Sequence, residues 1–144
     1  AFPSAGARYP LEVYPCVRAV EGLDAGVYHY RFDLHALELV REGDVSAELA
    51  EAALGQGMVA AAGVDFVITA VFARTTSRYK QRGYRYAYLD AGALGEHIHL
   101  SAVALGLGSC LIGAFQDDAV ERVAGVDGEE EQAVYMVSVG RMRR

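Results

Sequence analysis

The chain has 144 residues, of which 53% are hydrophobic and 22% charged, and these values are typical of a folded domain rather than a disordered segment. Its net charge of −6 argues against nucleic acid or an anionic membrane as a partner, because both require a surplus of Lys and Arg. Two cysteines, Cys16 and Cys110, make no disulfide framework, and no apolar run reaches the roughly 20 residues of a membrane helix. We therefore expect a cytoplasmic protein.

The first segments predict strands. Residues Glu12 to Val20 alternate in polarity, and Pro15 predicts an edge position or a bulge because proline cannot donate to a strand ladder. The segments from Gly26 to Tyr30 and from His35 to Arg41 are rich in aromatic and β-branched residues around a short polar break. They predict a hairpin.

A helix and a buried strand come next. Ser46 to Leu54 has a helical composition, with Asp44 or Ser46 as the N-cap. Val64 to Phe72 is almost entirely apolar, so we expect a strand that is buried on both faces.

The longest predicted helix runs from Tyr84 to Leu105, because apolar residues recur there at three- and four-residue steps. Gly92 and Gly95 would weaken this helix, so their presence predicts close approach by another backbone, such as the same helix of a twofold-related copy. A strand, a helix and a strand follow over Ser109–Ile112, Asp117–Val123 and Ala133–Val139. This mixture of hairpins and long helices indicates the α+β class.

Metal binding and cysteine nucleophilicity have weak support. His97 and His99 are two residues apart on a predicted helix, so they point to different faces and cannot readily share a metal. Cys110 lies in an apolar strand, where a thiol usually acts as a small buried hydrophobe. We expect structural roles for all three residues.

Three other segments are candidates for a binding site. The small-residue loop from Pro3 to Pro10 would let backbone groups approach a flat or phosphorylated ligand, although an ordinary turn has the same composition. The glycine-rich segment Gly106–Phe115 follows a helix, so it is not the Rossmann fingerprint. The segment Arg74–Arg85 holds five basic residues, and no acid lies between Asp65 and Asp90. It is either a solvated helix face or a site for an anionic substrate or cofactor phosphate.

Five segments in this order resemble the nitroreductase superfamily, and most closely its SagB-type dehydrogenase branch. They are Pro3–Glu12, which is similar to the Pro-Ser-rich flavin loop, then Tyr79–Tyr86, Leu89–Gly92, Ala102–Gly108 and Gly113–Asp118. The resemblance covers nearly the whole chain, with Glu131 and Val139–Gly140 also in place. We therefore predict a single nitroreductase-like domain over residues 1–144 that lacks the N-terminal helix of the family.

The resemblance implies an FMN-dependent oxidoreductase with a mixed central sheet and flanking helices. Two protomers would form an intertwined homodimer that holds FMN in the shared interface, with the flavin loop coming from one chain. By position, the loop would line the ribityl chain and ring, backbone groups after the Ser109 strand would face the ring, and a C-terminal arginine would bind the phosphate. These residues are Pro3, Ser4, Ala5, Gly6 and Arg8 in the loop, Ile112, Gly113 and Ala114 at the ring, and Arg143 or Arg144, in preference to Arg141, at the phosphate.

SagB-type enzymes that oxidise azoline rings in peptides use a Lys-Tyr pair near the flavin, and Arg78-Tyr79 aligns with it. The family Lys is thus absent, although Lys80 is adjacent. Nearby positive charge favours a phenolate, so we expect Tyr79 to be catalytic or to position substrate, with electrostatic support from Arg78. The alternative is that Tyr79 only packs on the sheet.

The substrate would be a small molecule or a peptide, and NAD(P)H could reduce the flavin, as in nitroreductase-like members. Two alternative functions stay open. One is a degenerate domain of the same fold that binds a partner or ligand without redox activity. The other is an anion-binding domain without flavin that uses residues 74–85. Flavin absorbance of the purified protein separates an FMN-dependent oxidoreductase from both alternatives.

Overall fold

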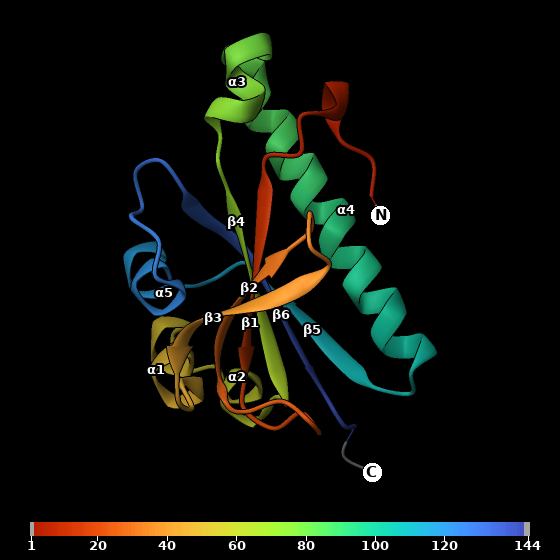
Figure 1. Cartoon of the computed structure of the whole chain (residues 1–144), viewed down its shortest axis with the longest axis vertical. Helices are drawn as coiled ribbons and strands as arrows, with labels where there is room; N and C mark the ends of the chain where they lie inside the picture. Colours follow the sequence, from red (N-terminus) through yellow and green to blue (C-terminus); the bar gives the residue numbers. More distant parts are fainter. Residues whose placement is uncertain (1, 143–144) are drawn as a thin grey trace.

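A computed structural model describes residues 2–142 and contains one six-stranded antiparallel sheet of order β3-β2-β1-β4-β6-β5 (Figure 1). The strands are β1 (Leu11–Val17), β2 (Gly26–Arg31), β3 (Ala36–Glu42), β4 (Val64–Ala70), β5 (Gly108–Ile112) and β6 (Gln132–Gly140). The helices are the short 3-10 turn η1 (Ala5–Ala7) and α1 (Ser46–Ala52), α2 (Gly57–Ala61), α3 (Ala73–Tyr79), α4 (Arg82–Ala104) and α5 (Asp117–Ala124). This architecture confirms the α+β class with flanking helices, but the expectation of a mixed sheet is wrong, because every strand pairing among the described residues is antiparallel.

Helices cover both faces of the sheet. In Figure 1, α4 lies along one side of the sheet and α1, α2 and α5 lie on the other. Because neighbouring residues of a strand point to opposite faces, Val67 of β4 and Met136 of β6 pack toward α1 and α5, whereas Ile68 and Val137 pack toward α4. Strands β4 and β6 therefore contribute side chains to both layers of the core.

The prediction that Pro15 marks an edge position or a bulge is wrong, because β1 is an inner strand that pairs with β4 without a register shift. Strand β1 lies inside the sheet, where Pro15 is opposite Phe66 of β4. Its pairing with β2 involves only Cys16 and Val17, so Pro15 takes no part in that second ladder. A proline is tolerated here because its missing N–H is not needed on that side.

Strand β4 is buried on both faces only from Val67 to Ala70. Val64 and Phe66 are half-buried, because they line a groove of about 1080 Å³ together with Leu94 and Ile98 of α4. The prediction of two-sided burial is therefore correct for the second half of the strand and wrong for the first.

The segment before α4 forms a helix of its own. The sequence predicted neither α3 nor the short α2, and it placed the start of α4 at Tyr84 rather than Arg82. Helices α3 and α4 meet at a sharp corner, where Lys80 has a left-handed φ of 52°. A Cβ atom on Gly83 would lie 2.8 Å from the Thr76 Cα, so only glycine allows the two helices to approach this closely.

Gly92 and Gly95, the two glycines in the middle of α4, differ in their surroundings. A Cβ atom on Gly95 would lie 3.1 Å from the Leu111 side chain, so Gly95 faces the sheet of its own chain and not a second copy, contrary to the prediction. Gly92 is exposed, a Cβ atom there would meet nothing within 4 Å, and it shares the outer face of α4 with Leu89 and Leu100. Within residues 2–142, no helix is long and apolar enough to cross a membrane.

Candidate functional site

The predicted flavin loop forms one compact turn ahead of β1. The Ser4 hydroxyl donates a hydrogen bond to the Asp90 carboxylate of α4 (Oγ to Oδ2, 2.5 Å) and accepts one from the Tyr9 N–H (2.9 Å). The Ser4 carbonyl also accepts a bond from the Ala7 N–H (3.0 Å). Asp90 is only 6% exposed, so a buried carboxylate holds an otherwise exposed loop.

Gly6 of the loop lies directly against Tyr79 at the end of α3. Gly6 has a left-handed φ of 59°, and a Cβ atom there would lie 3.2 Å from the Tyr79 Cζ atom. The Tyr79 ring also packs edge-to-face on Tyr86, with 5.0 Å between ring centroids, and the Arg78 guanidinium lies 5.6 Å from the Tyr79 centroid. The structure thus brings the predicted loop and the Arg78-Tyr79 pair together.

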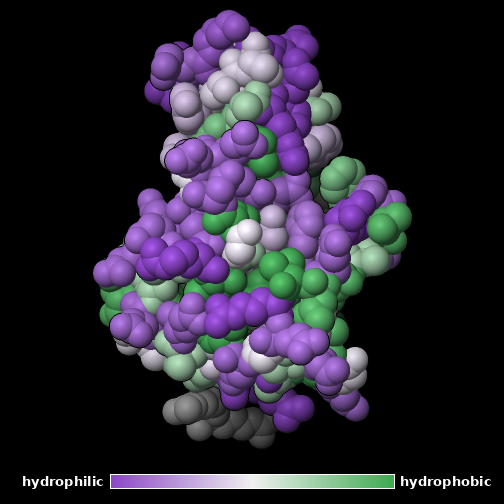
Figure 2. All heavy atoms as spheres, turned by 60° about the vertical axis from the view of Figure 1, so that its left-hand side comes forward, coloured by the Kyte–Doolittle hydropathy of each residue, from purple (hydrophilic) through white to green (hydrophobic). Residues whose placement is uncertain are grey.

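Arg74 does not belong to an unneutralised basic patch. Its guanidinium forms an ion pair with Glu12 of β1 (2.6 Å) and donates to the Tyr9 carbonyl (3.2 Å). The sequence window missed this partner because Glu12 is 62 residues away along the chain. The other four basic residues of the segment are exposed and form no ion pair within the described residues; they are Arg78, Lys80, Arg82 and Arg85. The end of the molecule that carries α3 is largely hydrophilic (Figure 2).

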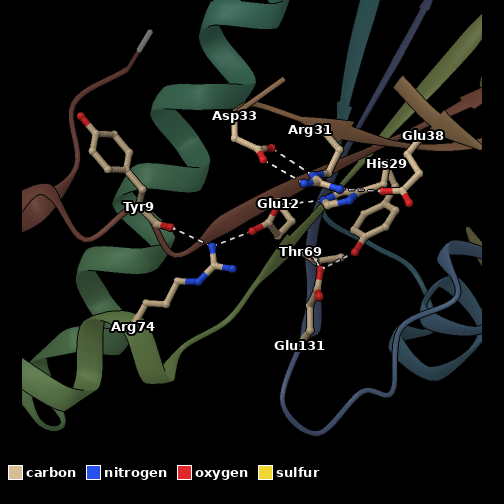
Figure 3. A network of polar contacts seen from close by, with 10 residues as sticks. Tyr9, Glu12, His29, Arg31, Asp33, Glu38, Thr69, Arg74 and Glu131 are labelled. Atoms are coloured by element: carbon tan, nitrogen blue, oxygen red, sulfur yellow. Dashed lines mark hydrogen bonds and ion pairs between the residues drawn. The ribbon is translucent and has the colours of Figure 1, made fainter. Parts of the chain in front are cut away.

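A polar network continues from Glu12 across the edge of the sheet (Figure 3). Glu12 also bonds the His29 ring (2.8 Å), which stacks on Tyr14 with 4.8 Å between centroids. The Tyr14 hydroxyl donates to Glu131 (2.9 Å), and Thr69 donates to the same carboxylate oxygen (2.5 Å). Burial, together with the negative charge of Glu131, raises the pKa of Tyr14. These residues tie three strands and α3 into one polar unit.

The second predicted part of the cofactor site lies at the end of β5. Ile112 is 2% exposed and its side chain packs in the core beneath α1 and α5. Gly113 and Ala114 are exposed, and within the part of the chain that the structure describes their N–H groups have no hydrogen-bond acceptor. A Cβ atom on Gly113 would meet nothing within 4 Å, whereas the Ala114 carbonyl is held by the Gln56 side chain (2.9 Å).

One chain does not bring the two predicted parts together. The loop is anchored on α4, whereas the Ile112 side chain packs on the opposite face of the sheet. Arg141 follows β6 and is exposed, at the end of β5 that begins with Gly108. Arg143 and Arg144 lie outside the described residues.

The histidines of α4 have local hydrogen-bond partners. The His97 ring donates from Nδ1 to the Ala93 carbonyl (2.7 Å), and the His99 ring bonds the Ser109 hydroxyl (2.6 Å). Within residues 2–142 no group of three or more metal-ligating side chains converges. Cys110 is half-buried rather than fully buried, because an open groove beside α2 reaches it.

A buried carboxyl group lies in the sheet below α2. Asp65 is 1% exposed and accepts a hydrogen bond from the Ser138 hydroxyl of the neighbouring strand. Burial raises the pKa of Asp65 to about 7, against the opposing effects of that hydrogen bond and of Arg18. In the strand opposite, burial raises the pKa of Cys16 to about 12. Sequence reasoning missed this group, because an acid in an apolar strand has no local pattern.

These features define a nitroreductase-type domain, and the chain belongs to the nitroreductase family, whose family model matches residues 1–141. Among its relatives, protein MJ1384 of Methanocaldococcus jannaschii is 39% identical over 96% of this chain and 69% of its own length. The trifolitoxin-processing protein TfxB of Rhizobium leguminosarum bv. trifolii is 32% identical over 98% of this chain and 39% of its own length.

A solved structure supports the same branch of the family. The Escherichia coli microcin synthetase McbBCD complex, with truncated pro-MccB17 bound, contains a chain that superposes with a TM-score of 0.87 and 26% identity. The match covers 99% of this chain and 56% of that one. Together with TfxB, this likeness supports the SagB-type branch. The chain spans less than two thirds of both TfxB and the matched McbBCD chain.

Proposed function

We propose that this chain is an FMN-dependent oxidoreductase domain of the SagB type. The observation that carries the proposal is the loop from Pro3 to Arg8, which is held on α4 by Asp90 and lies with Gly6 against Tyr79. A small-residue loop with this support presents backbone groups to a flat ligand. Bound FMN would supply the hydride chemistry, so the chain needs only to bind, orient and shield.

The residues present fit a flavin. The Gly113 and Ala114 N–H groups are exposed and lack an acceptor in the described chain, and the space beside Gly113 is open, so a ring could approach the backbone there. Two backbone donors at this place would stabilise negative charge on a reduced ring. The arginines after β6 have the planar fork that suits a phosphate. Arg143 and Arg144 would take this role.

The geometry favours a site shared between two copies of the chain. Gly113 and Arg141 lie at opposite ends of the edge strand β5, whose five residues span roughly 14 Å. The loop is anchored on α4, away from Ile112, so a second copy would have to deliver it. The outer face of α4 exposes Leu89 and Leu100, 63% and 56% of their surfaces, and could pair with its twofold mate.

We propose a peptide substrate in preference to a free small molecule. TfxB processes trifolitoxin, and the McbBCD complex holds a truncated pro-microcin, so two relatives act in peptide maturation. In this chain Tyr79 would hold or move a proton at its hydroxyl oxygen, and the Arg78 guanidinium over its ring would support it electrostatically. NAD(P)H is the proposed hydride donor if the reaction is a reduction.

The test is flavin content. The full-length protein should be yellow when purified, with a flavin-to-protein ratio near one, and should lose the colour reversibly on anaerobic addition of NADPH or dithionite. A colourless protein that does not take up added FMN would contradict the proposal. It would favour the degenerate domain that binds a partner without redox activity. Phosphate-ligand binding without flavin would favour the anion-binding alternative.

A further inference from the structure

We propose that Asp90 is a positioning residue that holds the flavin loop in its binding conformation through Ser4. This inference rests on the proposed function in one respect only, namely that the ligand of the loop is FMN. Neither the family match nor the relatives assign a role to this carboxylate.

The Ser4 hydroxyl forms two hydrogen bonds within the protein. It has one proton to donate, and Asp90 accepts it; one of its two lone pairs accepts the Tyr9 N–H. Ser4 therefore cannot donate to a cofactor while this bond is present. We infer that its side chain shapes the loop, which differs from the direct flavin contact that its position in the sequence suggested.

Asp90 depends on Ser4 in return. Its carboxylate is 6% exposed and forms no ion pair within residues 2–142. A buried ionised group needs hydrogen-bond partners, and a hydroxyl that donates to a carboxylate makes one of the stronger hydrogen bonds in proteins. Ser4 and Asp90 therefore each provide a hydrogen-bond partner that the other needs. Their bond joins residues 86 positions apart in the sequence.

The loop needs an anchor because its backbone is strained. Gly6, Ala7 and Tyr9 have φ values of 59°, 52° and 45°, and the left-handed region is unfavourable for Ala and Tyr. Such conformations persist only where the surroundings hold them. One end of the loop is held by Asp90 through Ser4, and the other by the Arg74 bond to the Tyr9 carbonyl.

The fraction of molecules with the anchored loop affects the measured affinity for FMN. A ligand that binds only the anchored loop has an apparent affinity reduced by the fraction of molecules in that conformation. Removing a hydrogen bond of this kind should reduce that fraction, and so weaken FMN binding roughly ten- to hundredfold.

The experiment compares Asp90→Ala, Asp90→Asn and Ser4→Ala with the double variant in the full-length protein, using titration with FMN. We expect a loss of roughly tenfold or more for Asp90→Ala and a smaller loss for Asp90→Asn, because the amide oxygen can still accept the Ser4 proton. The double variant should lose no more than Ser4→Ala, since both changes break the same contact. Losses that add would overturn the inference, because they would show that Ser4 acts on the flavin independently of Asp90.

A matched control separates positioning from general stability. Glu121 of α5 is also a buried carboxylate, 8% exposed, and it accepts the Ala133 N–H (3.0 Å) far from the loop. Glu121→Ala should lower the melting temperature and leave FMN affinity unchanged. If Glu121→Ala weakens FMN binding as much as Asp90→Ala does, the effect of Asp90 is general and the inference is wrong.

A measurement without flavin distinguishes failure of the Asp90 inference from failure of the proposed function. Amide hydrogen exchange at Ala7 and Tyr9 should be faster in Asp90→Ala than in the wild type when no FMN is present. If the wild type does not bind FMN, the proposed function fails, and faster exchange would still support Asp90 as the anchor of the loop. Unchanged exchange at these amides would overturn the inference whatever the flavin content.

Discussion

For Tyr79, the question is whether the side chain only packs or also transfers a proton. Its ring lies against Gly6 of the loop and against the ring of Tyr86, and these contacts are compatible with packing and with the proposed proton transfer. The corner at Lys80 sets this position, because α3 ends just before it and α4 begins two residues after it. The Tyr79 ring is therefore placed by the end of α3 and by its contact with Tyr86 of α4.

Substitution of Tyr79 by Phe separates the two roles. The ring remains, so stability and FMN binding should stay near wild type. If the hydroxyl transfers a proton, turnover should fall roughly 10²–10⁴-fold. Steady-state kinetics measures this, with Tyr86→Phe as the control, because Tyr86 packs on Tyr79. Turnover of Tyr79→Phe at the wild-type rate would leave packing as the role of Tyr79.

Arg143 and Arg144, which lie outside the described residues, are the proposed ligands of the FMN phosphate. Joint replacement of Arg143 and Arg144 by Ala should weaken FMN binding by roughly ten- to hundredfold, because a charge-assisted phosphate contact is lost. Retention of flavin on dialysis measures the effect. Arg122→Ala, which breaks only an exposed pair with Asp118, is the control. Unchanged retention in the double variant would point to Arg141 instead.

Asp65 should make stability depend on pH. Its folded pKa of about 7 lies above the ordinary 3.8, so the folded state binds its proton more tightly than the unfolded chain does. Stability is then lost as pH rises from about 4 through 7, by on the order of 4 kcal/mol in total. Asp65→Asn should remove this dependence. Urea unfolding of both proteins at pH 5 and pH 8 measures it.

The expected outcome is an advantage of Asp65→Asn that is larger at pH 8 than at pH 5. An exposed acid should behave in the opposite way. The Arg122 guanidinium lowers the pKa of Asp118, so Asp118→Asn should cost a little stability, chiefly at neutral pH. A constant difference between Asp65→Asn and wild type at both pH values would contradict the assignment.

At the scale of elements, the Glu12 network decides where α3 lies. Glu12 is 8% exposed and bonds Arg74 in the first turn of α3 as well as His29 of β2. This single carboxylate therefore connects the sheet to the helix that carries Tyr79. Arg74 is therefore paired with Glu12, although no acidic residue lies near Arg74 in the sequence.

Glu12→Gln should loosen α3. Loss of the ion pair should cost on the order of 1–2 kcal/mol and speed amide exchange over residues 73–79. Glu38→Gln is the matched control, because Glu38 pairs with Arg31 at the surface, where such pairs contribute little to stability. Equal effects of the two variants on α3 exchange would show that Glu12 does not anchor this helix.

At the scale of the whole molecule, the outer face of α4 exposes large apolar side chains that a second copy of the chain would bury. Its exposed large side chains recur at helical spacing around Gly92, where a close approach is sterically open. The same helix carries Asp90 on its inner face. A dimer through α4 would therefore place two flavin loops close to the shared interface.

Leu100→Glu with Val103→Glu should abolish this dimer. Two carboxylates at residues that are 56% and 57% exposed would be desolvated and would repel their copies across a twofold axis. Sedimentation of the full-length protein at micromolar concentration should show a dimer for wild type and a monomer for the double variant. Leu54→Glu, at a similarly exposed residue after α1, should remain dimeric. A monomeric wild type would contradict the prediction.

The sequence by itself determined the class of fold and the identity of most elements. A nearly continuous apolar run located β4, and three- and four-residue spacing located α4. The N-cap of α1 is Val45, so the prediction of Asp44 or Ser46 as the cap is wrong, although the Asp44 carboxylate accepts the Ser46 N–H (2.9 Å). These signals are local, since side-chain periodicity follows directly from strand and helix geometry. The ordered motifs of the loop and of α4 were sufficient to identify the family.

Only the tertiary structure decided which residues meet. The pairing of Arg74 with Glu12 and of Ser4 with Asp90 joins residues 62 and 86 positions apart, and the placement of Pro15 inside the sheet depends on which ladder omits it. Gly95 likewise faces its own sheet, because the rotation of α4 is set by packing on β5 and β6. A sequence window sees neighbours along the chain, whereas burial and charge are compensated by neighbours in space.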